Sequence, residues 1–359
     1  MTDLSLFDYK LRPEFIAQEP KEPRDHSRLL ILNRRTGEII HKKFFQILDF
    51  LGPDDVLVFN NTEVVNSRLF GRKLQTGGKA EVLLLKPASK TVFDYTFWPE
   101  RWEIISKPKL KKSLKIKFSD SLSGEIKSAC HWPELKALAG GKENLIVFNK
   151  KGEALKREIL KLAQVPLPPY IKKPTPSSFK NYQTVYAKNK GSVAAPTAGF
   201  HFTEKLLAKI KKKGAEMEFL TLHIGLGTFE PIRVREVEKH KMQPEYFSLS
   251  KETALRLNKA KIKKKRIIAV GTTVTRVIEN CVDKNGFLKP KKGLTNLFLC
   301  PGFKFKFVDA LITNFHLPQS TLLLLVSAFA SRELIFKAYQ EAIKKKYRFY
   351  SFGDAMFIQ

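Results

Sequence analysis

Short apolar runs bounded by turn residues recur along the chain and predict buried strands. The clearest are LLILN at 29–33, VLVFN at 56–60, MEFLTLHIGL at 217–226, RIIAVG at 266–271 and FVDALITNF at 307–315. A helical segment over residues 43–51 can join the first two runs.

Segments with helical spacing separate the apolar runs in the second half of the chain. We expect helices at 204–213, 251–265, 272–281, 320–330 and 332–346. In the last of them the apolar positions Ile335, Ala338, Tyr339, Ala342 and Ile343 recur at the period of an amphipathic helix. Alternating strands and helices predict a large layered α/β domain.

Residues 67–156 have a different pattern, with many short alternating runs separated by glycine-containing turns. Several short strands at this spacing favour a small all-β barrel. We therefore expect a discontinuous α/β domain formed by 1–66 plus 157–359, with 67–156 inserted as the barrel. The proline-rich stretch 157–186, which contains VPLPPYIKKPTPSSF, is expected to connect them, since proline resists both helix and central strand.

The stretch ALITNFHLPQSTLLLLVSAFA at 310–330 contains the apolar run Leu322–Val326. A membrane span needs roughly 20 mostly apolar residues. Here Ser327 interrupts the run, and Arg332 and Glu333 follow it closely. We interpret the stretch as a buried helix with polar residues at its start, and we expect no membrane association.

The 359 residues carry 65 basic and 35 acidic side chains, a net charge of +30. This bias suits a polyanionic partner such as RNA, whereas lysine enrichment of a solvated surface is the alternative. The lysine runs are dispersed, so charge alone does not locate an RNA site.

The three cysteines are far apart with no CxxC pair, so we expect no metal site. They fit a reducing compartment, and the N-terminus has no secretory h-region, so we expect a cytoplasmic protein.

Ligands of open α/β sheets bind beyond the carboxyl ends of the strands, so the residues that follow each predicted strand are the candidates. Gly271-Thr272-Thr273, with Arg276 after it, follows RIIAV and favours an anion at a helix N-terminus; an ordinary N-cap is the alternative. His223 lies on its strand before Gly225 and Gly227, and either a ligand or close backbone packing accounts for the glycines.

Three further stretches carry polar groups. His316 follows Asn314 and precedes the helix start at Ser320 and Thr321, whose positive end would lower an imidazole pKa and favour a neutral base. The second is SVAAPTAGFHF at 192–202, and the third is HKMQPEYF at 240–247, which contains Glu245. Each has a structural alternative: a histidine bonded to backbone, a tight turn before a helix capped by Thr203, and a surface carboxylate.

Several common enzyme classes lack their motifs in this chain. GxxxxGK[ST] is absent, and no GxGxxG follows a strand, which disfavours a nucleotide kinase and a classical dinucleotide enzyme. GxSxG is also absent, so a serine hydrolase of the α/β kind has no support.

These stretches, in this order, resemble one family, the S-adenosylmethionine:tRNA ribosyltransferase-isomerases of queuosine biosynthesis. The matching runs cover the chain apart from the barrel region, where the similarity is loose. They are VLVFNNTEVVNSRLFGRK, VPLPPYI, YQTVYA, GSVAAPTAGFHF, TLHIGLGTFEPI, HKMQPEYF, IAVGTTVTR, TNFHLPQSTLLLLVSAFA and YRFYSFGDAMFI. The resemblance implies a large α/β domain with an inserted small β-barrel.

The resemblance also implies the reaction. The ribosyl part of S-adenosylmethionine moves to 7-aminomethyl-7-deazaguanine at the tRNA wobble position and rearranges, giving epoxyqueuosine with release of adenine and methionine. S-adenosylmethionine is then a co-substrate, the ribosyl donor, and the partner is tRNA that carries the deazaguanine precursor.

The chemistry, rather than the resemblance, suggests roles for the candidates. A base must remove a ribose proton beside the sulfonium, and His316, His223 and His201 are the candidate base or acid groups. Glu245 could contact the sulfonium or the incoming amine. The methionine carboxylate needs an anion site, for which 271–276 is our hypothesis. The candidate substrate-binding residues are Thr197, Gly199, His201, Gly225, Gly227, Thr272, Thr273, Arg276, Asn314, Ser320 and Thr321.

One position departs from the family pattern. The family usually has His-x-Met-His-x-Glu, whereas here Gln243 stands in place of the second histidine, before Glu245. Glutamine cannot titrate, so we do not assign the base to this position.

Two other functions fit the charge. An S-adenosylmethionine-dependent RNA methyltransferase would also use an α/β core, although the glycine-rich fingerprint after the first strand is absent. A non-catalytic RNA-binding protein would use the barrel, where Trp98 and Trp102 flank Arg101 and offer stacking surfaces. For these tryptophans we favour the alternative that they fill the barrel core.

Overall fold

The computed structural model describes residues 2–88, 98–128, 144–225 and 232–359. The chain forms two compact units. The first, the α/β unit, comprises Met1–Glu63, Leu167–Asn189 and Ala195–Gln359, and the second, the barrel unit, comprises Val64–Pro166 and Lys190–Ala194. The expected insertion 67–156 lies within the second unit.

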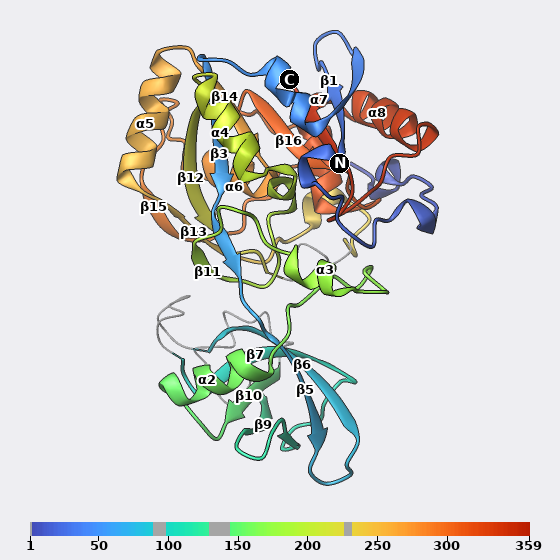
Figure 1. Ribbon diagram of the computed structural model, residues 1–359, viewed down its shortest axis with the longest axis vertical. Helices are drawn as coiled ribbons and strands as arrows, with labels where there is room; N and C mark the ends of the chain where they lie inside the picture. The colour runs from blue at the N-terminus through green and yellow to red at the C-terminus, as the bar shows by residue number, and fades with distance from the viewer. Residues whose placement is uncertain (1, 89–97, 129–143, 226–231) are drawn as a thin grey trace. The chain divides into compact units, whose positions relative to one another are not determined.

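A nine-stranded mixed sheet forms the centre of the α/β unit (Figure 1). Its strands in spatial order are β15 (Lys291–Thr295), β13 (Glu245–Leu249), β12 (Glu216–Leu222), β3 (Asp55–Asn60), β14 (Arg266–Val270), β16 (Ala310–Asn314), β17 (Ala355–Ile358), β1 (Arg28–Leu32) and β2 (Ile39–Lys43). The four neighbours β12, β3, β14 and β16 run parallel to one another. The predicted α/β class is therefore confirmed.

Helices flank this sheet, and most of them begin at capping side chains. The α-helices of the unit are α3 (Pro176–Lys180), α4 (Glu204–Lys212), α5 (Lys251–Ile262), α6 (Thr272–Cys281), α7 (Thr321–Ala330) and α8 (Arg332–Lys344). Thr203, Ser250 and Ser320 cap α4, α5 and α7, because each side chain accepts a hydrogen bond from a backbone N–H in the first turn. Short 3₁₀ turns are η1 (Leu4–Phe7), η2 (Pro13–Phe15), η3 (Arg24–His26), η4 (Phe44–Phe50), η6 (Thr197–His201) and η8 (Val237–Lys239).

One face of the sheet packs into a continuous apolar core. Leu57, Phe59, Ile268 and Ile312 from adjacent strands are fully buried there. Helix α4 and the segment before it contribute further apolar side chains, Phe202, Leu206 and Ile210. Every residue of β3 is buried, as expected of a central strand covered on both faces, so its run is apolar without alternation.

The structure corrects several expected elements. The helical segment expected at 43–51 is present as the 3₁₀ helix η4, whereas the strand expected at 217–226 ends at Leu222. Strand β17 comes from the C-terminus and pairs antiparallel with β16 and parallel with β1. This strand was not predicted, because a run of four residues does not indicate which strands it pairs with in the sheet.

A closed six-stranded antiparallel barrel forms the second unit and confirms the predicted barrel. Its strands in spatial order are β10 (Asn144–Phe148), β7 (Arg101–Lys107), β6 (Lys79–Pro87), β5 (Arg68–Lys73), β8 (Lys115–Lys117) and β9 (Ser123–Ser128). Helix α2 (Gly152–Leu162) inserts Leu155 and Ile159 into the barrel's apolar cluster. The proline-rich stretch expected to start at 157 therefore begins inside a helix. The short strands β4 (Thr62–Val64) and β11 (Asn189–Ser192) pair with each other.

Trp98 and Trp102 belong to the barrel core. Their exposed fractions are 5% and 2%, and their ring centroids lie 5.1 Å apart. They are therefore not available for stacking with a nucleic acid. This agrees with the favoured interpretation, that the tryptophans fill the barrel core.

Helix α7 contains the apolar run that raised the question of a membrane. It has 10 residues, and Leu323, Leu324 and Leu325 are buried within the unit. None of the described helices combines the length and apolar composition that crossing a membrane requires.

Shortening a core side chain in β3 should destabilise the protein strongly. Leu57→Ala removes a fully buried side chain and should lower the free energy of unfolding by about 2–5 kcal/mol. The matched control Leu255→Ala, on α5 and 59% exposed, should change it by less than about 0.5 kcal/mol. Urea unfolding followed by far-UV circular dichroism measures both, and equal effects would contradict the assigned core.

Candidate functional site

Polar residues gather where the four parallel strands of the α/β unit end. His223 follows β12, Asn60 ends β3, Gly271 follows β14 and His316 lies two residues beyond β16. Because the strands are parallel neighbours, these ends lie along one edge of the sheet. At about 4.8 Å per strand, the residues after β12 and β16 are separated by about 14 Å.

Asn60 links the centre of this edge. Its Nδ2 donates to the Leu222 carbonyl at 3.0 Å and to Thr273 Oγ1 at 3.3 Å. Its Oδ1 accepts from the backbone N–H of Leu222 at 3.0 Å and of Thr62 at 3.1 Å. Asn60 therefore holds the ends of β12, β3 and α6 together. This role of Asn60 was not predicted, although an amide that ends an apolar strand was a usable signal.

His223 is held by a hydroxyl and a ring. Its Nδ1 lies 2.7 Å from Thr62 Oγ1, and its imidazole stacks on Tyr246 with ring centroids 5.5 Å apart. Burial lowers the pKa of His223 to about 4. At neutral pH the imidazole is therefore uncharged and able to accept or donate a hydrogen bond.

Glu245 and Arg276 form a buried ion pair next to this histidine's strand. Arg276 Nη1 donates to Glu245 Oε2, and both side chains are 5% exposed. Glu245 Oε1 also accepts from the backbone N–H of Gly225 at 2.9 Å, and Arg276 Nε donates to the Leu297 carbonyl at 3.1 Å. Arg276 Nη2 is buried without a hydrogen-bond partner in the described part of the chain. An unsatisfied buried guanidinium nitrogen is costly, so it is a candidate anion ligand.

The N-terminus of α6 lies four residues before Arg276. Gly271 is the N-cap residue, with φ of +98°, a backbone conformation that favours glycine. A threonine cap was the expected alternative, but Thr273 Oγ1 accepts from Asn60, and Thr275 Oγ1 donates to the Gly271 carbonyl at 3.3 Å. With no cap side chain at Gly271, the N–H groups at this helix end are oriented to receive an anion.

His316 is fixed by three hydrogen bonds at the far end of the edge. Its Nε2 lies 2.8 Å from Thr313 Oγ1, its backbone N–H donates to Tyr339 Oη at 2.9 Å, and its carbonyl accepts from Tyr9 Oη. Burial lowers its pKa to about 3, so burial and not the helix end is the cause. The other ring nitrogen, Nδ1, makes no hydrogen bond to the residues that the structure describes.

The polar residues around His316 differ in what they contact. Asn314 Nδ2 donates to the Tyr350 carbonyl at 3.0 Å, and Asn314 Oδ1 accepts from Thr197 Oγ1 at 3.4 Å. Ser320 is occupied as the cap of α7, and its hydroxyl donates to the Leu317 carbonyl at 2.7 Å. Thr321, in the first turn of α7, is buried.

Two candidate residues on η6, Gly199 and His201, pack against neighbouring side chains. A Cβ on Gly199 would lie 2.0 Å from Tyr186 Oη, so the close approach of this tyrosine requires glycine. His201 Nδ1 lies 2.7 Å from Ser27 Oγ, and its ring stacks on Phe44 at 4.9 Å. Burial lowers the pKa of His201 to about 4. These contacts hold Nδ1 and one face of the ring against the core, whereas Nε2 is buried without a hydrogen-bond partner among the described residues.

The residues at this edge thus fall into groups. The first, the β12 cluster, consists of two hydrogen-bonded sets, one of Asn60, Thr62, His223 and Thr273 and one of Gly225, Glu245 and Arg276. A second, the β16 cluster, contains Thr197, Thr313, Asn314 and His316. Thr272 lies between them on α6. Gln243 is exposed, two residues before Glu245, and Gly227 lies outside the described residues.

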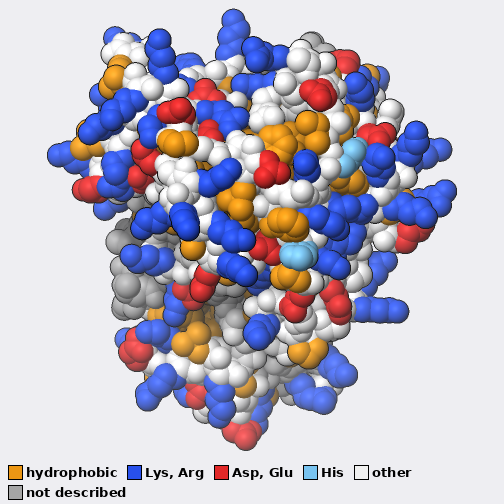
Figure 2. Space-filling view, turned by 45° about the horizontal axis from the view of Figure 1, so that its top comes forward, with side chains coloured by type: hydrophobic (Ala, Val, Ile, Leu, Met, Phe, Trp, Pro, Cys, Tyr) orange, Lys and Arg blue, Asp and Glu red, His pale blue; other side chains and the backbone are white. Residues whose placement is uncertain are grey.

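Basic side chains do not point to a single site. Figure 2 shows Lys and Arg spread across the face drawn, with acidic side chains among them. The groups of His, Cys, Asp and Glu in the described residues include none that could hold a metal ion.

An open α/β sheet with buried imidazoles and a helix end without a side-chain cap at its carboxyl edge is typical of α/β proteins that bind a ligand at that edge. A family model described as "Queuosine biosynthesis protein" matches residues 4–358, and the chain belongs to that family.

Two relatives support this assignment. The S-adenosylmethionine:tRNA ribosyltransferase-isomerase of Halothermothrix orenii is 47% identical over 355 residues, which are 98% of each chain. The crystal structure of S-adenosylmethionine tRNA ribosyltransferase from Thermotoga maritima is 33% identical, with a TM-score of 0.53 over 99% of this chain and 100% of that one.

The buried histidines should make stability depend on pH. The pKa of His316 falls from 6.5 unfolded to about 3 folded, so the unfolded state binds the proton and stability is lost as pH falls through this window. One such group contributes about 1.4 kcal/mol per pH unit near pH 5. His316→Gln should reduce the pH slope of the unfolding free energy by that amount.

Urea unfolding at a series of pH values measures this slope. Above pH ~7.5 the difference between wild type and variant should not depend on pH, because neither state protonates the imidazole. An unchanged slope near pH 5 would show that His316 is not buried in the neutral form.

Proposed function

We propose that this protein transfers and isomerises the ribosyl moiety of S-adenosylmethionine onto 7-aminomethyl-7-deazaguanine at the tRNA wobble position. The products are epoxyqueuosine in tRNA, adenine and methionine. The observation that carries the proposal is the row of neutral imidazoles and the buried arginine at the carboxyl edge of the sheet, in a chain of this family. Since the substrate is tRNA, we propose that the protein acts in the cytoplasm.

The reaction needs a base, because the sulfonium acidifies the neighbouring ribose C5′ hydrogens and one must be removed. A histidine with a lowered pKa is unprotonated at neutral pH and can accept that proton. His223 and His316 lie about 14 Å apart by strand spacing, so they serve different parts of the bound substrates.

We assign proton removal to His316. If Nε2–H donates to Thr313 Oγ1, the lone pair of Nδ1 is left available, and Nδ1 has no partner among the described residues. His223 is engaged by Thr62 and stacked on Tyr246, which suits a group that binds or polarises substrate. Thr313 is then a positioning residue, because its hydroxyl holds the ring of His316 in place.

Arg276 and the N-terminus of α6 suit the methionine carboxylate. The guanidinium has a buried nitrogen without a partner, and the helix end presents N–H groups four residues earlier. Glu245 orients Arg276 and the Gly225 N–H, and its remaining negative charge favours a nearby sulfonium or amine. Thr197, Thr272, Asn314 and Thr321 complete the proposed substrate contacts, together with Gly227.

Released products separate the alternatives. Wild-type protein incubated with S-adenosylmethionine and precursor-bearing tRNA should release adenine and methionine in equal amounts. Formation of S-adenosylhomocysteine would instead identify a methyltransferase, and an absence of turnover with folded protein and correct tRNA would favour an RNA-binding protein.

Variants of the Thr313–His316 pair test the base. His316→Gln should lower kcat by about 100-fold or more, since general-base catalysis contributes about 10²–10⁴-fold. Thr313→Val should lower kcat and alter the pH profile, whereas Thr313→Ser should restore both, because only the hydroxyl is needed. Equal activity of Thr313→Val and wild type would remove the proposed positioning of His316 by the hydroxyl.

Arg276 variants test the carboxylate site. Arg276→Met should raise the KM for S-adenosylmethionine by about 10- to 100-fold, because a hydrogen bond between charged groups is lost. It should also weaken inhibition by methionine but not inhibition by adenine. The double variant Arg276→Gln with Glu245→Gln avoids a buried unpaired carboxylate and serves as the control for folding. Unchanged methionine inhibition in both variants would place the carboxylate elsewhere.

A further inference from the structure

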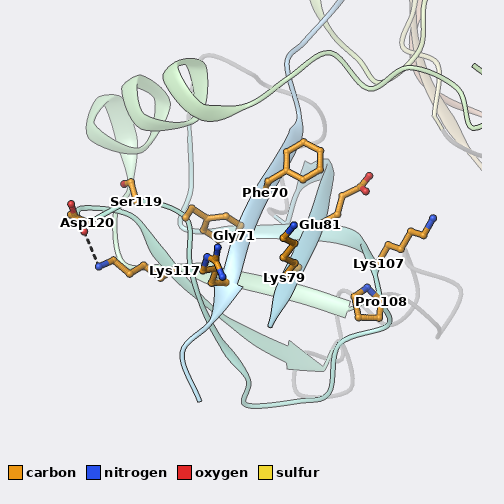
Figure 3. A pocket seen from close by; sticks show the side chains of 12 residues that line it. Phe70, Gly71, Lys79, Glu81, Lys107, Pro108, Lys117, Ser119 and Asp120 are labelled. Carbon is orange, nitrogen blue, oxygen red and sulfur yellow. Dashed lines mark ion pairs between the residues drawn. The ribbon is translucent and has the colours of Figure 1, made fainter. Parts of the chain in front are cut away.

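A basic groove crosses the outer face of the barrel (Figure 3). It has a volume of about 930 Å³ and lies over β8, β5, β6 and β7. Its charged lining residues are Arg72, Lys79, Glu81, Lys107, Lys117 and Asp120. Phe70 stands among them and is 50% exposed.

Strand register places three cations in one row. Arg72 pairs with Lys79 on β6 and with Lys117 on β8, so the three side chains are direct cross-strand neighbours. Leu69 and Ile116 alternate with them and are fully buried, so Arg72 and Lys117 point away from the core. Like charges directly opposite one another destabilise a sheet. A bound polyanion would relieve that repulsion.

The acidic residues of the groove do not neutralise the row. Glu81 pairs with Arg68 at 3.2 Å, outside the groove, and Asp120 pairs with Lys117 at 2.7 Å. Asp120 is fully exposed, so that pair is weak. Arg72, Lys79 and Lys107 have no carboxylate partner within the described residues.

Phe70 adds an apolar ring beside these cations. It lies on β5, two positions before Arg72 on the same outward face, opposite Glu81. A half-exposed phenylalanine flanked by cations combines the two elements of a single-stranded nucleic acid site, a stacking ring and charges that follow the phosphates. Lys107, opposite Glu81 on β7, extends the charged surface past the ring.

We propose that this groove binds the RNA substrate, with Arg72, Lys79 and Lys107 contacting phosphates and Phe70 stacking on an unpaired base. The proposal rests on the proposed function for the identity of the RNA as tRNA. The groove belongs wholly to the barrel unit and includes none of the residues assigned to the reaction.

Salt dependence tests the phosphate contacts. The probe is an unmodified tRNA transcript, with affinity measured by filter binding over a series of salt concentrations. Each lost phosphate contact lowers the steepness of log affinity against log salt by about 0.7–0.9. Arg72→Gln, Lys79→Gln and Lys107→Gln combined should therefore reduce the slope by about 2 to 3.

The matched control removes the same charge from the same unit. Lys151→Gln, Arg157→Gln and Lys161→Gln combined change exposed positions at and within α2, away from the groove lining. This variant should change the slope by less than about 1, the value of a single contact. An equal loss in both triple variants would show that net charge and not the groove binds RNA, and would overturn the proposal.

Phe70 variants test stacking separately. Phe70→Ala should weaken tRNA binding about tenfold without changing the salt slope, since stacking contributes affinity without charge. Phe70→Tyr should retain wild-type affinity, and Phe70→Leu should behave like Phe70→Ala. Unchanged affinity of Phe70→Ala would refute the stacking contact.

Adenine release separates this proposal from the function on which it rests. If adenine is released and the groove variants bind tRNA as wild type does, the groove proposal fails while the proposed function stands. If no adenine is released but the groove variants alone lose the salt slope, the groove binds RNA and the proposed reaction fails. Loss of binding to anionic lipid vesicles with tRNA binding intact would identify a membrane-surface site and overturn the RNA assignment.

Discussion

The candidate site depends on one constraint, the alignment of four parallel strand ends at a single edge. Asn60 enforces it, because one buried amide bonds to β12, to the segment after β3 and to the first turn of α6. An amide in an apolar core is costly unless all its groups are satisfied, and here each finds a partner. The same hydrogen bonds that satisfy Asn60 therefore set the spacing of the groups that meet the ligand.

Burial gives the site its chemistry. The low-dielectric core that stabilises the α/β unit also disfavours charged imidazole, which lowers the pKa of His223 to about 4 and of His316 to about 3. Charge survives at this edge only where it is paired, as in Glu245 with Arg276. A site of neutral imidazoles and one ion pair suits a cationic sulfonium donor, from which adenine and methionine are released. We propose that the barrel binds the polyanionic substrate.

Much of the fold was accessible from pattern, since β1, β3, β14 and α6 lie within one residue of their expected ranges. The insertion of β17 between β16 and β1 was not, because strand order depends on contacts between segments far apart in sequence. Among site residues, Arg276 and His316 were recognised by their place after strands, and His223 by its place on a strand before two glycines. Asn60, Thr62 and Thr313 were missed, because their importance lies in which histidine or strand each one contacts.

The sequence by itself determined the class of the fold, the barrel inserted in it, the family and the set of chemically capable residues, because periodicity, turn residues and long matching runs are local properties. Only the tertiary structure decided which of those residues work together. It showed that His316 bonds to Thr313 beside the end of β16 whereas His201 stacks on Phe44, and it placed Phe70 rather than Trp98 on the barrel surface. Burial and proximity arise from long-range packing, which no single stretch of sequence contains.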